Sequence, residues 1–203
     1  MKGFSLGSGR QRGRIHRASE NRGGGKKLYL IIGGVAAVFL IGFGALVYFD
    51  SQQGPGGAPA GVATFDNLAR DHVEGSIDYA ETPPVGGEHN DPWQNCGFYE
   101  EPVRNENAVH SLEHGAIWIT YSPDLGEGEV DAIREIANGQ TYILASPYED
   151  LPSPVVASAW GNQLELESAA DSEELDQFIR AFRQGPQTPE PGAACTGGVG
   201  SPS

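Results

Sequence analysis

The chain has 203 residues and a formal net charge of −14, and its charges are distributed unevenly along the sequence. Eight basic residues and one acidic residue precede residue 28, whereas five basic and 26 acidic residues follow residue 49. The strongly acidic C-terminal part argues against nucleic acid and anionic lipid surfaces as ligands. We therefore expect no nucleic-acid partner, and the sequence leaves any protein partner unknown.

Residues 28–49 form a run of 22 residues without a charge. Because a helix of roughly 20 apolar residues crosses a bilayer, this run predicts a transmembrane helix. The run favours a retained anchor over a cleaved signal peptide, since it is longer than the apolar part of such peptides. Positively charged flanks stay in the cytoplasm, so we expect residues 1–27 to be a basic, disordered cytoplasmic tail. The predicted location is the cell membrane, single-pass, with the C-terminal domain extracytoplasmic.

The rest of the chain divides by composition into three parts. Residues 50–62 are rich in Gly and Pro and predict a linker. Residues 63–195 predict one extracytoplasmic domain, and residues 196–203 predict a flexible C-terminal tail. Residues 64–73 have mixed helical character, and roughly residues 74–109 show no periodic element. A loop of this length in a small domain is usually functional or held by additional constraints.

Regular structure is predicted after residue 115. The β-branched and apolar runs indicate strands at residues 116–121, 140–145, 155–160 and 163–167. Helical spacing of apolar residues indicates helices at 127–137 and 172–184, the second capped by Asp171 with Glu174 as its capping-box partner. This order predicts a single small α+β domain, with a mostly antiparallel sheet and two or three packed helices, preceded by one transmembrane helix.

The two cysteines, Cys96 and Cys195, both follow the predicted membrane span. Two thiols in one small domain in an oxidising compartment favour a disulfide. Closing a loop of about 100 residues contributes up to ~4.7 kcal/mol in the chain-entropy model. The alternative is that Cys96 is a thiolate ligand of a metal.

All four histidines that follow residue 49 lie between residues 72 and 114: His72, His89, His110 and His114. Imidazole is the commonest metal ligand in proteins. His110 and His114 are four residues apart, so they share one face of either a helix or a strand. We predict that these four side chains bind one transition metal and that Glu113 orients an imidazole through its free N–H group.

An all-imidazole ligand set suits copper, zinc, iron or nickel. Copper(II) binds such sites most strongly, so we predict copper, with zinc as the alternative. The predicted function is a redox or copper-handling role, which includes a superoxide dismutase-like oxidoreductase. One alternative is a non-enzymatic envelope module with structural zinc or no metal. A further alternative is a zinc peptidase, because His-Ser-Leu-Glu-His at residues 110–114 matches the His-x-x-Glu-His motif.

Four short motifs have a distinctive spacing: Pro83-Pro84-x-Gly86-Gly87-x-His89, Trp93-x-x-Cys96-Gly97-x-Tyr99, Val109-His110-x-Leu112-Glu113-His114-Gly115 and Ala159-Trp160-Gly161. Together they resemble a bacterial family, the domain of unknown function 3105, over about residues 62–195. Gly86 stands where we expect Ser in that pattern. The resemblance implies an exported, membrane-anchored domain with these histidines at the pattern positions, and it implies no established activity.

Overall fold

The computed structural model of the chain describes residues 57–203 together with residues 29, 32 and 42. The predicted cytoplasmic tail, nearly all of the predicted transmembrane helix and part of the linker lie outside the described residues. Within the part that is described, no helix is both long enough and apolar enough to cross a membrane. The membrane anchor therefore stays a prediction.

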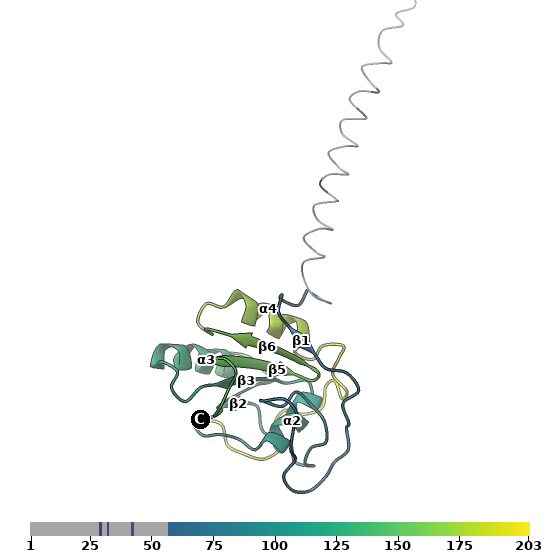
Figure 1. Ribbon diagram of the computed structural model, residues 1–203, viewed down its shortest axis with the longest axis vertical. Coiled ribbons are helices and arrows are strands. Elements are labelled where there is room, and N and C mark those ends of the chain that lie inside the picture. The colour runs from purple at the N-terminus through teal and green to yellow at the C-terminus, as the bar shows by residue number, and fades with distance from the viewer. Residues whose placement is uncertain (1–28, 30–31, 33–41, 43–56) are drawn as a thin grey trace, which may run out of the picture. The chain divides into compact units, whose positions relative to one another are not determined.

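Six strands form one sheet in the order β1-β6-β5-β3-β4-β2 (Figure 1). The strands are β1 (Ala63–Thr64), β2 (Gly97–Phe98), β3 (Ile117–Tyr121), β4 (Ile143–Pro147), β5 (Val155–Ala159) and β6 (Asn162–Leu166). The pairings β1–β6, β6–β5 and β5–β3 are antiparallel, whereas β3–β4 and β4–β2 are parallel. The α+β class is confirmed, but the sheet is mixed. The β3–β4 pairing is parallel because helix α3 (Glu127–Gly139) connects the two strands as a crossover.

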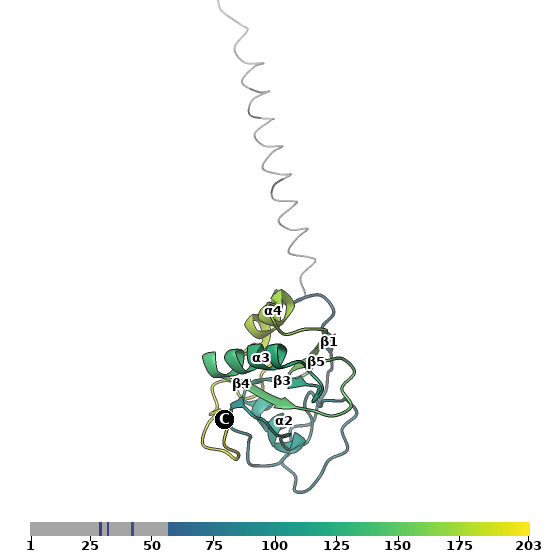
Figure 2. The same ribbon diagram turned by 90° about the vertical axis from the view of Figure 1, so that its left-hand side faces the viewer.

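Helices cover both faces of the sheet (Figures 1 and 2). On one face, α3 and α4 (Glu173–Phe182) pack against alternate strand residues and form the larger hydrophobic core. On the other face, α2 (Asn105–Glu113) packs through Ala108, Val109 and Leu112 on Trp118 and Leu144. Strand residues alternate between faces, so β3 contributes Ile117 and Ile119 to the first core and Trp118 to the second.

Helix α2 lies partly in the stretch for which the sequence showed no periodic element. Its nine residues include few apolar side chains, and most of its polar side chains are nevertheless buried. The mixed helical character of residues 64–73 was misleading, because that segment is β1 followed by irregular backbone. Burial of polar residues is exceptional unless they have partners, so hydrophobic periodicity could not reveal α2.

Two of the predicted boundaries differ from the structure for a reason that the backbone shows. The N-cap of α4 is Ser172, whose hydroxyl accepts a hydrogen bond from the backbone N–H of Leu175, at 3.1 Å. The predicted cap, Asp171, instead has a positive φ of 53° in the preceding turn. Strand β4 begins at Ile143 rather than residue 140, since Tyr142 has a φ of 57° and cannot continue a strand.

The C-terminal segment is held against residues 93–98. Cys96 and Cys195 form a disulfide with a Cα–Cα distance of 5.4 Å, which confirms the predicted pairing and excludes Cys96 as a thiolate ligand. Residues 196–203, for which we expected a flexible tail, continue along the same segment. Val199 pairs with Gln94 as a β-bridge, and Ser203 N–H donates to the carbonyl oxygen of Phe98 at 2.8 Å.

Glu129 joins α3 to the turn between β6 and α4. Its carboxylate accepts hydrogen bonds from the backbone N–H groups of Ala170 and Ala169, at 3.0 and 2.7 Å, and from the Ser168 hydroxyl at 2.8 Å. These bonds favour the ionised carboxylate and lower the pKa of Glu129 below its usual value of 4.5. Its contribution to stability is therefore complete above about pH 4.5 and is lost as the pH falls through the lowered pKa.

We predict that Glu129→Gln lowers the free energy of unfolding by about 1 kcal/mol at neutral pH, because an amide accepts these bonds less strongly than a carboxylate. The difference between variant and parent should shrink toward zero at pH 3. Urea unfolding of a chain lacking residues 1–49 measures this difference in the free energy of unfolding. An equal difference at both pH values would contradict the stabilising role of the ionised Glu129 carboxylate.

Candidate metal centre

Helix α2 supplies two of the polar side chains at the centre. His110 and Glu113 are three residues apart, so they lie on the same face of the helix. Both residues are buried, with relative exposures of 4% for His110 and 3% for Glu113. The apolar side chains of α2 pack on the sheet on the other side of the helix. The polar face is therefore directed at the irregular segment between β1 and β2, residues 65–96, which we call the long loop.

The long loop supplies His72 and His89. These residues form an isolated parallel β-bridge, in which Val73 N–H donates to the His89 carbonyl oxygen at 2.8 Å. His89 N–H in turn donates to the carbonyl oxygen of Asp71 at 3.1 Å. The side-chain amide of Asn90 adds a bond to the Val73 carbonyl oxygen at 2.8 Å. The backbone therefore fixes two histidines 17 residues apart beside one another.

The three imidazoles and the carboxylate form one group. The ring centroids are separated by 4.8 Å for His72–His89, 4.7 Å for His72–His110 and 4.8 Å for His89–His110. Glu113 Oε2 lies 3.0 Å from His89 Nε2 and 3.9 Å from His72 Nε2. One atom from each of the four residues lies within 4.8 Å of the others. Ligands about 2.1 Å from a tetrahedral ion lie roughly 3.4 Å apart, so the four side chains would have to move slightly closer together to coordinate one ion.

Backbone carbonyl oxygens fix the tautomers of the two buried imidazoles. His89 Nδ1 lies 2.9 Å from the Gly87 oxygen, and His110 Nδ1 lies 2.9 Å from the Asn90 oxygen. A carbonyl oxygen only accepts hydrogen bonds, so each Nδ1 carries a proton, and in the neutral form of each ring Nε2 presents a lone pair. A hydrogen-bonded Nδ1–H and a free Nε2 are the usual state of a metal-binding histidine.

His89 gives the strongest test of whether these residues fit a metal ion. Its side chain is fully buried, and its Nε2 is a buried nitrogen without a hydrogen-bond partner. The nearest polar atom is the buried Glu113 oxygen at 3.0 Å, which is also an acceptor when the carboxylate is ionised. Two facing acceptors repel one another unless a proton or a metal cation lies between them. The donor set therefore fits a bound cation.

His72 is the solvent-facing member of the group, with a side chain that is 43% exposed. Its Nδ1 lies 3.3 Å from Asp91 Oδ1 on the protein surface, and its Nε2 is directed at Glu113. A carboxylate on one ring nitrogen orients the other toward a metal. The group thus has one edge open to solvent and three buried members.

His114, which we predicted to be a ligand, lies outside this group. Its Nδ1–H donates to the Ala194 carbonyl oxygen at 2.7 Å, and its Nε2 lies 3.7 Å from a Glu190 carboxylate oxygen. Glu113, which we expected to orient an imidazole, is the fourth member of the group. The sequence allowed this arrangement, since a three-residue separation also shares a helix face. The peptidase motif would need both His110 and His114 on the ion, and the geometry does not favour that alternative.

Burial shapes the charge of the centre. It lowers the pKa of His110 from 6.5 to about 4, and protonated His114, His89 or His72 nearby would act in the same direction. The bond to the Asn90 carbonyl oxygen opposes this effect. His110 is therefore a neutral imidazole at neutral pH, which is the protonation state that metal binding requires.

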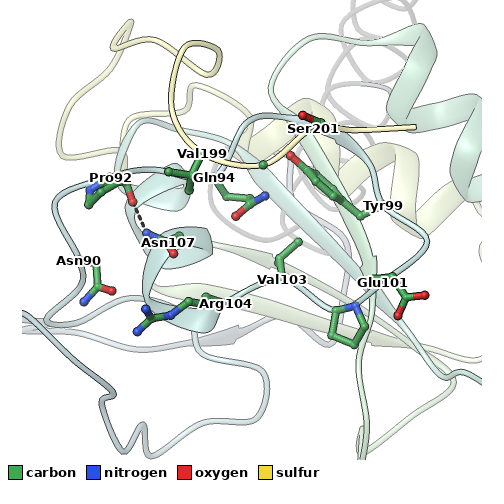
Figure 3. A pocket seen from close by; sticks show the side chains of 12 residues that line it. Asn90, Pro92, Gln94, Tyr99, Glu101, Val103, Arg104, Asn107, Val199 and Ser201 are labelled. Carbon is green, nitrogen blue, oxygen red and sulfur yellow. Dashed lines mark hydrogen bonds between the residues drawn. The ribbon is translucent and has the colours of Figure 1, made fainter.

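Figure 3 shows a surface pocket whose lining includes Asn107 of α2. Its lining comes from the loops on either side of β2, from α2 and from the C-terminal segment, and it contains none of the four residues of the centre. Figure 3 shows Val199 next to Gln94 and Ser201 next to Tyr99 along one rim. The pocket and the centre are thus separate features that share the loop around Asn90.

Residues 72–197 match the model of a family described as protein of unknown function (DUF3105). The chain belongs to the DUF3105 family. The match begins at His72 and includes the four histidines that follow residue 49, Glu113 and both cysteines, so the resemblance inferred from the sequence motifs is confirmed. Neither the curated proteins nor the solved structures contain a significant match to the chain. Membership of DUF3105 brings no assigned activity, and the function must be argued from the centre itself.

We predict that the metal-free domain loses stability as the pH falls from about 6.5 to about 4. In this range the unfolded chain binds a proton at residue 110, whereas the folded chain keeps His110 neutral. The loss should be roughly 3 kcal/mol, since the two pKa values differ by about 2.5 units and one unit corresponds to about 1.4 kcal/mol. Urea unfolding after chelator treatment measures it. The variant His110→Asn should show a smaller loss over this range, and an unchanged pH dependence would refute the assignment.

Proposed function

We propose that the domain binds one divalent transition-metal ion through His72, His89, His110 and Glu113. The observation that carries this proposal is the buried His89 Nε2, which faces the buried Glu113 oxygen at 3.0 Å. Two further imidazoles lie against this pair at centroid distances below 5 Å. Burying a carboxylate is costly unless it is paired or binds a metal, and a divalent cation would satisfy all four groups together.

Copper(II) is the ion that we propose first. Imidazole and carboxylate ligands accept copper, zinc, iron and nickel, and copper(II) binds most strongly in the divalent series. In that case the domain has a redox or copper-handling role outside the membrane. The half-exposed His72 and the adjacent Asp91 would give the ion one edge that a small molecule or a partner can reach.

Structural zinc is the second candidate. Four protein ligands, three of them buried, are typical of a closed structural site, whereas catalytic zinc usually keeps one position for water. The centre also joins the long loop to α2, as a structural ion does. The two candidates differ in their spectra, because copper(II) is paramagnetic and coloured and zinc(II) is neither.

We further propose that residues 28–49 anchor the chain in the cell membrane with the domain outside. The support is the uncharged run of 22 residues and the excess of basic residues before it. The Cys96–Cys195 disulfide is consistent with an oxidising compartment.

Metal analysis tests the proposed centre. Full-length protein purified in detergent without chelators should contain about one equivalent of copper or zinc, as a single four-ligand site requires. The double variant His89→Ala/His110→Ala should contain little or none, because it removes both buried imidazoles. His16→Ala, which changes the one histidine that precedes residue 49, should keep the full metal content. Equal metal contents in all three proteins would contradict the proposal.

Membrane topology is tested separately. The protein should remain in the membrane pellet after an alkaline carbonate wash, because a spanning helix is not released by charge repulsion. Protease added outside spheroplasts should remove a C-terminal epitope tag and spare an N-terminal tag. Protection of the C-terminal tag would reverse the proposed orientation.

A further inference from the structure

The C-terminal segment, residues 184–203, wraps around the end of α2 immediately after the proposed ligands. Gln184 N–H donates to the Gly115 carbonyl oxygen at 3.0 Å, and the Gln184 amide donates to the His114 carbonyl oxygen. Glu190 N–H donates to the carbonyl oxygen of Glu113 at 3.1 Å. The backbone of one proposed ligand, Glu113, is thus held by a segment about 80 residues further along the chain.

His114 connects this segment to the centre through its side chain. Its Nδ1–H bonds to the Ala194 carbonyl oxygen at 2.7 Å, and its ring packs edge-on against His110 with centroids 4.5 Å apart. Trp93 packs on both rings, at 5.2 Å from His114 and 5.9 Å from His110. The side chain of His114 is only 5% exposed. The His110 ring is therefore supported by the His114 and Trp93 rings.

The disulfide holds the segment at the residue that follows Ala194. Cys195 is bonded to Cys96, and the Cys96 N–H donates to the Cys195 carbonyl oxygen at 2.8 Å. Further along, Gly198 lies so close to Trp93 that a Cβ atom there would be 2.7 Å from the indole Cδ1. The disulfide thus fixes the acceptor of the His114 bond and helps to keep Trp93 in place.

We propose that His114 is a positioning residue that makes metal retention depend on the Cys96–Cys195 disulfide. This inference rests on the proposed metal-binding function. The covalent bond holds Ala194, Ala194 orients the His114 ring, and that ring together with Trp93 keeps His110 directed at the ion. Without the disulfide, the segment depends on hydrogen bonds alone, and the His110 imidazole gains freedom that metal binding must remove. Mutation of a residue that orients a metal ligand typically lowers the metal affinity 10- to 100-fold.

The test compares copper(II) affinities of full-length variants in detergent, measured by competition with a chelator of known affinity. Cys96→Ser/Cys195→Ser and His114→Ala should each weaken binding by at least about tenfold. His114→Asn should recover much of this loss, because its amide N–H occupies nearly the position of Nδ1–H and can reach the Ala194 oxygen. Glu129→Gln, which destabilises the domain without touching the segment, should bind as the parent does.

Electron paramagnetic resonance distinguishes positioning from ligation. The copper(II) spectrum of His114→Asn should equal that of the parent, since the coordinating atoms are unchanged. A spectrum with one nitrogen fewer would make His114 a ligand and overturn the inference. Parent-like affinities in the folded cysteine and His114→Ala variants would also overturn it while leaving the proposed metal site intact. If the cysteine variant does not fold, the affinities of His114→Ala and His114→Asn decide whether His114 positions His110. A parent protein that binds neither copper nor zinc would overturn the proposed function itself.

Discussion

The structure depends on how it accommodates one buried carboxylate, that of Glu113, beside the buried imidazole of His89. An isolated carboxylate in a protein interior is strongly unfavourable, and so is an unpaired imidazole nitrogen. Here the two lie 3.0 Å apart, with His110 and His72 completing the surroundings. The proposed divalent cation would resolve the arrangement, because it would supply the positive charge and accept the lone pairs of all four groups.

The two faces of the sheet differ in the same sense. The α3/α4 face is a core of packed apolar side chains. The α2 face packs fewer apolar side chains and directs polar residues toward a loop with little regular structure. That side is held by the His72–His89 bridge and by the disulfide, while a metal ion would join the loop directly to α2. Such a site contributes to folding as well as to chemistry.

Local patterns in the sequence were sufficient for β3, β5, β6 and α4, where apolar periodicity and turn residues agree with the final structure. The cysteine pairing also followed from the two cysteines and the expected compartment. Local patterns could not predict helix α2, because its buried residues are mainly polar. The parallel β3–β4 pairing depends on the crossover of α3, which an alternating pattern does not encode. The choice between Glu113 and His114 depends on contacts with Ala194 and the long loop, far away in sequence.

The most direct measurement is the structure of the metal-loaded protein with the ion located by anomalous scattering at its absorption edge. The account predicts one ion about 2.0 to 2.2 Å from an imidazole nitrogen of His72, His89 and His110 and from a carboxylate oxygen of Glu113. It also predicts that His114 keeps its bond to the Ala194 oxygen. An ion coordinated by His114, or a loaded crystal with no ion among these four residues, would contradict it.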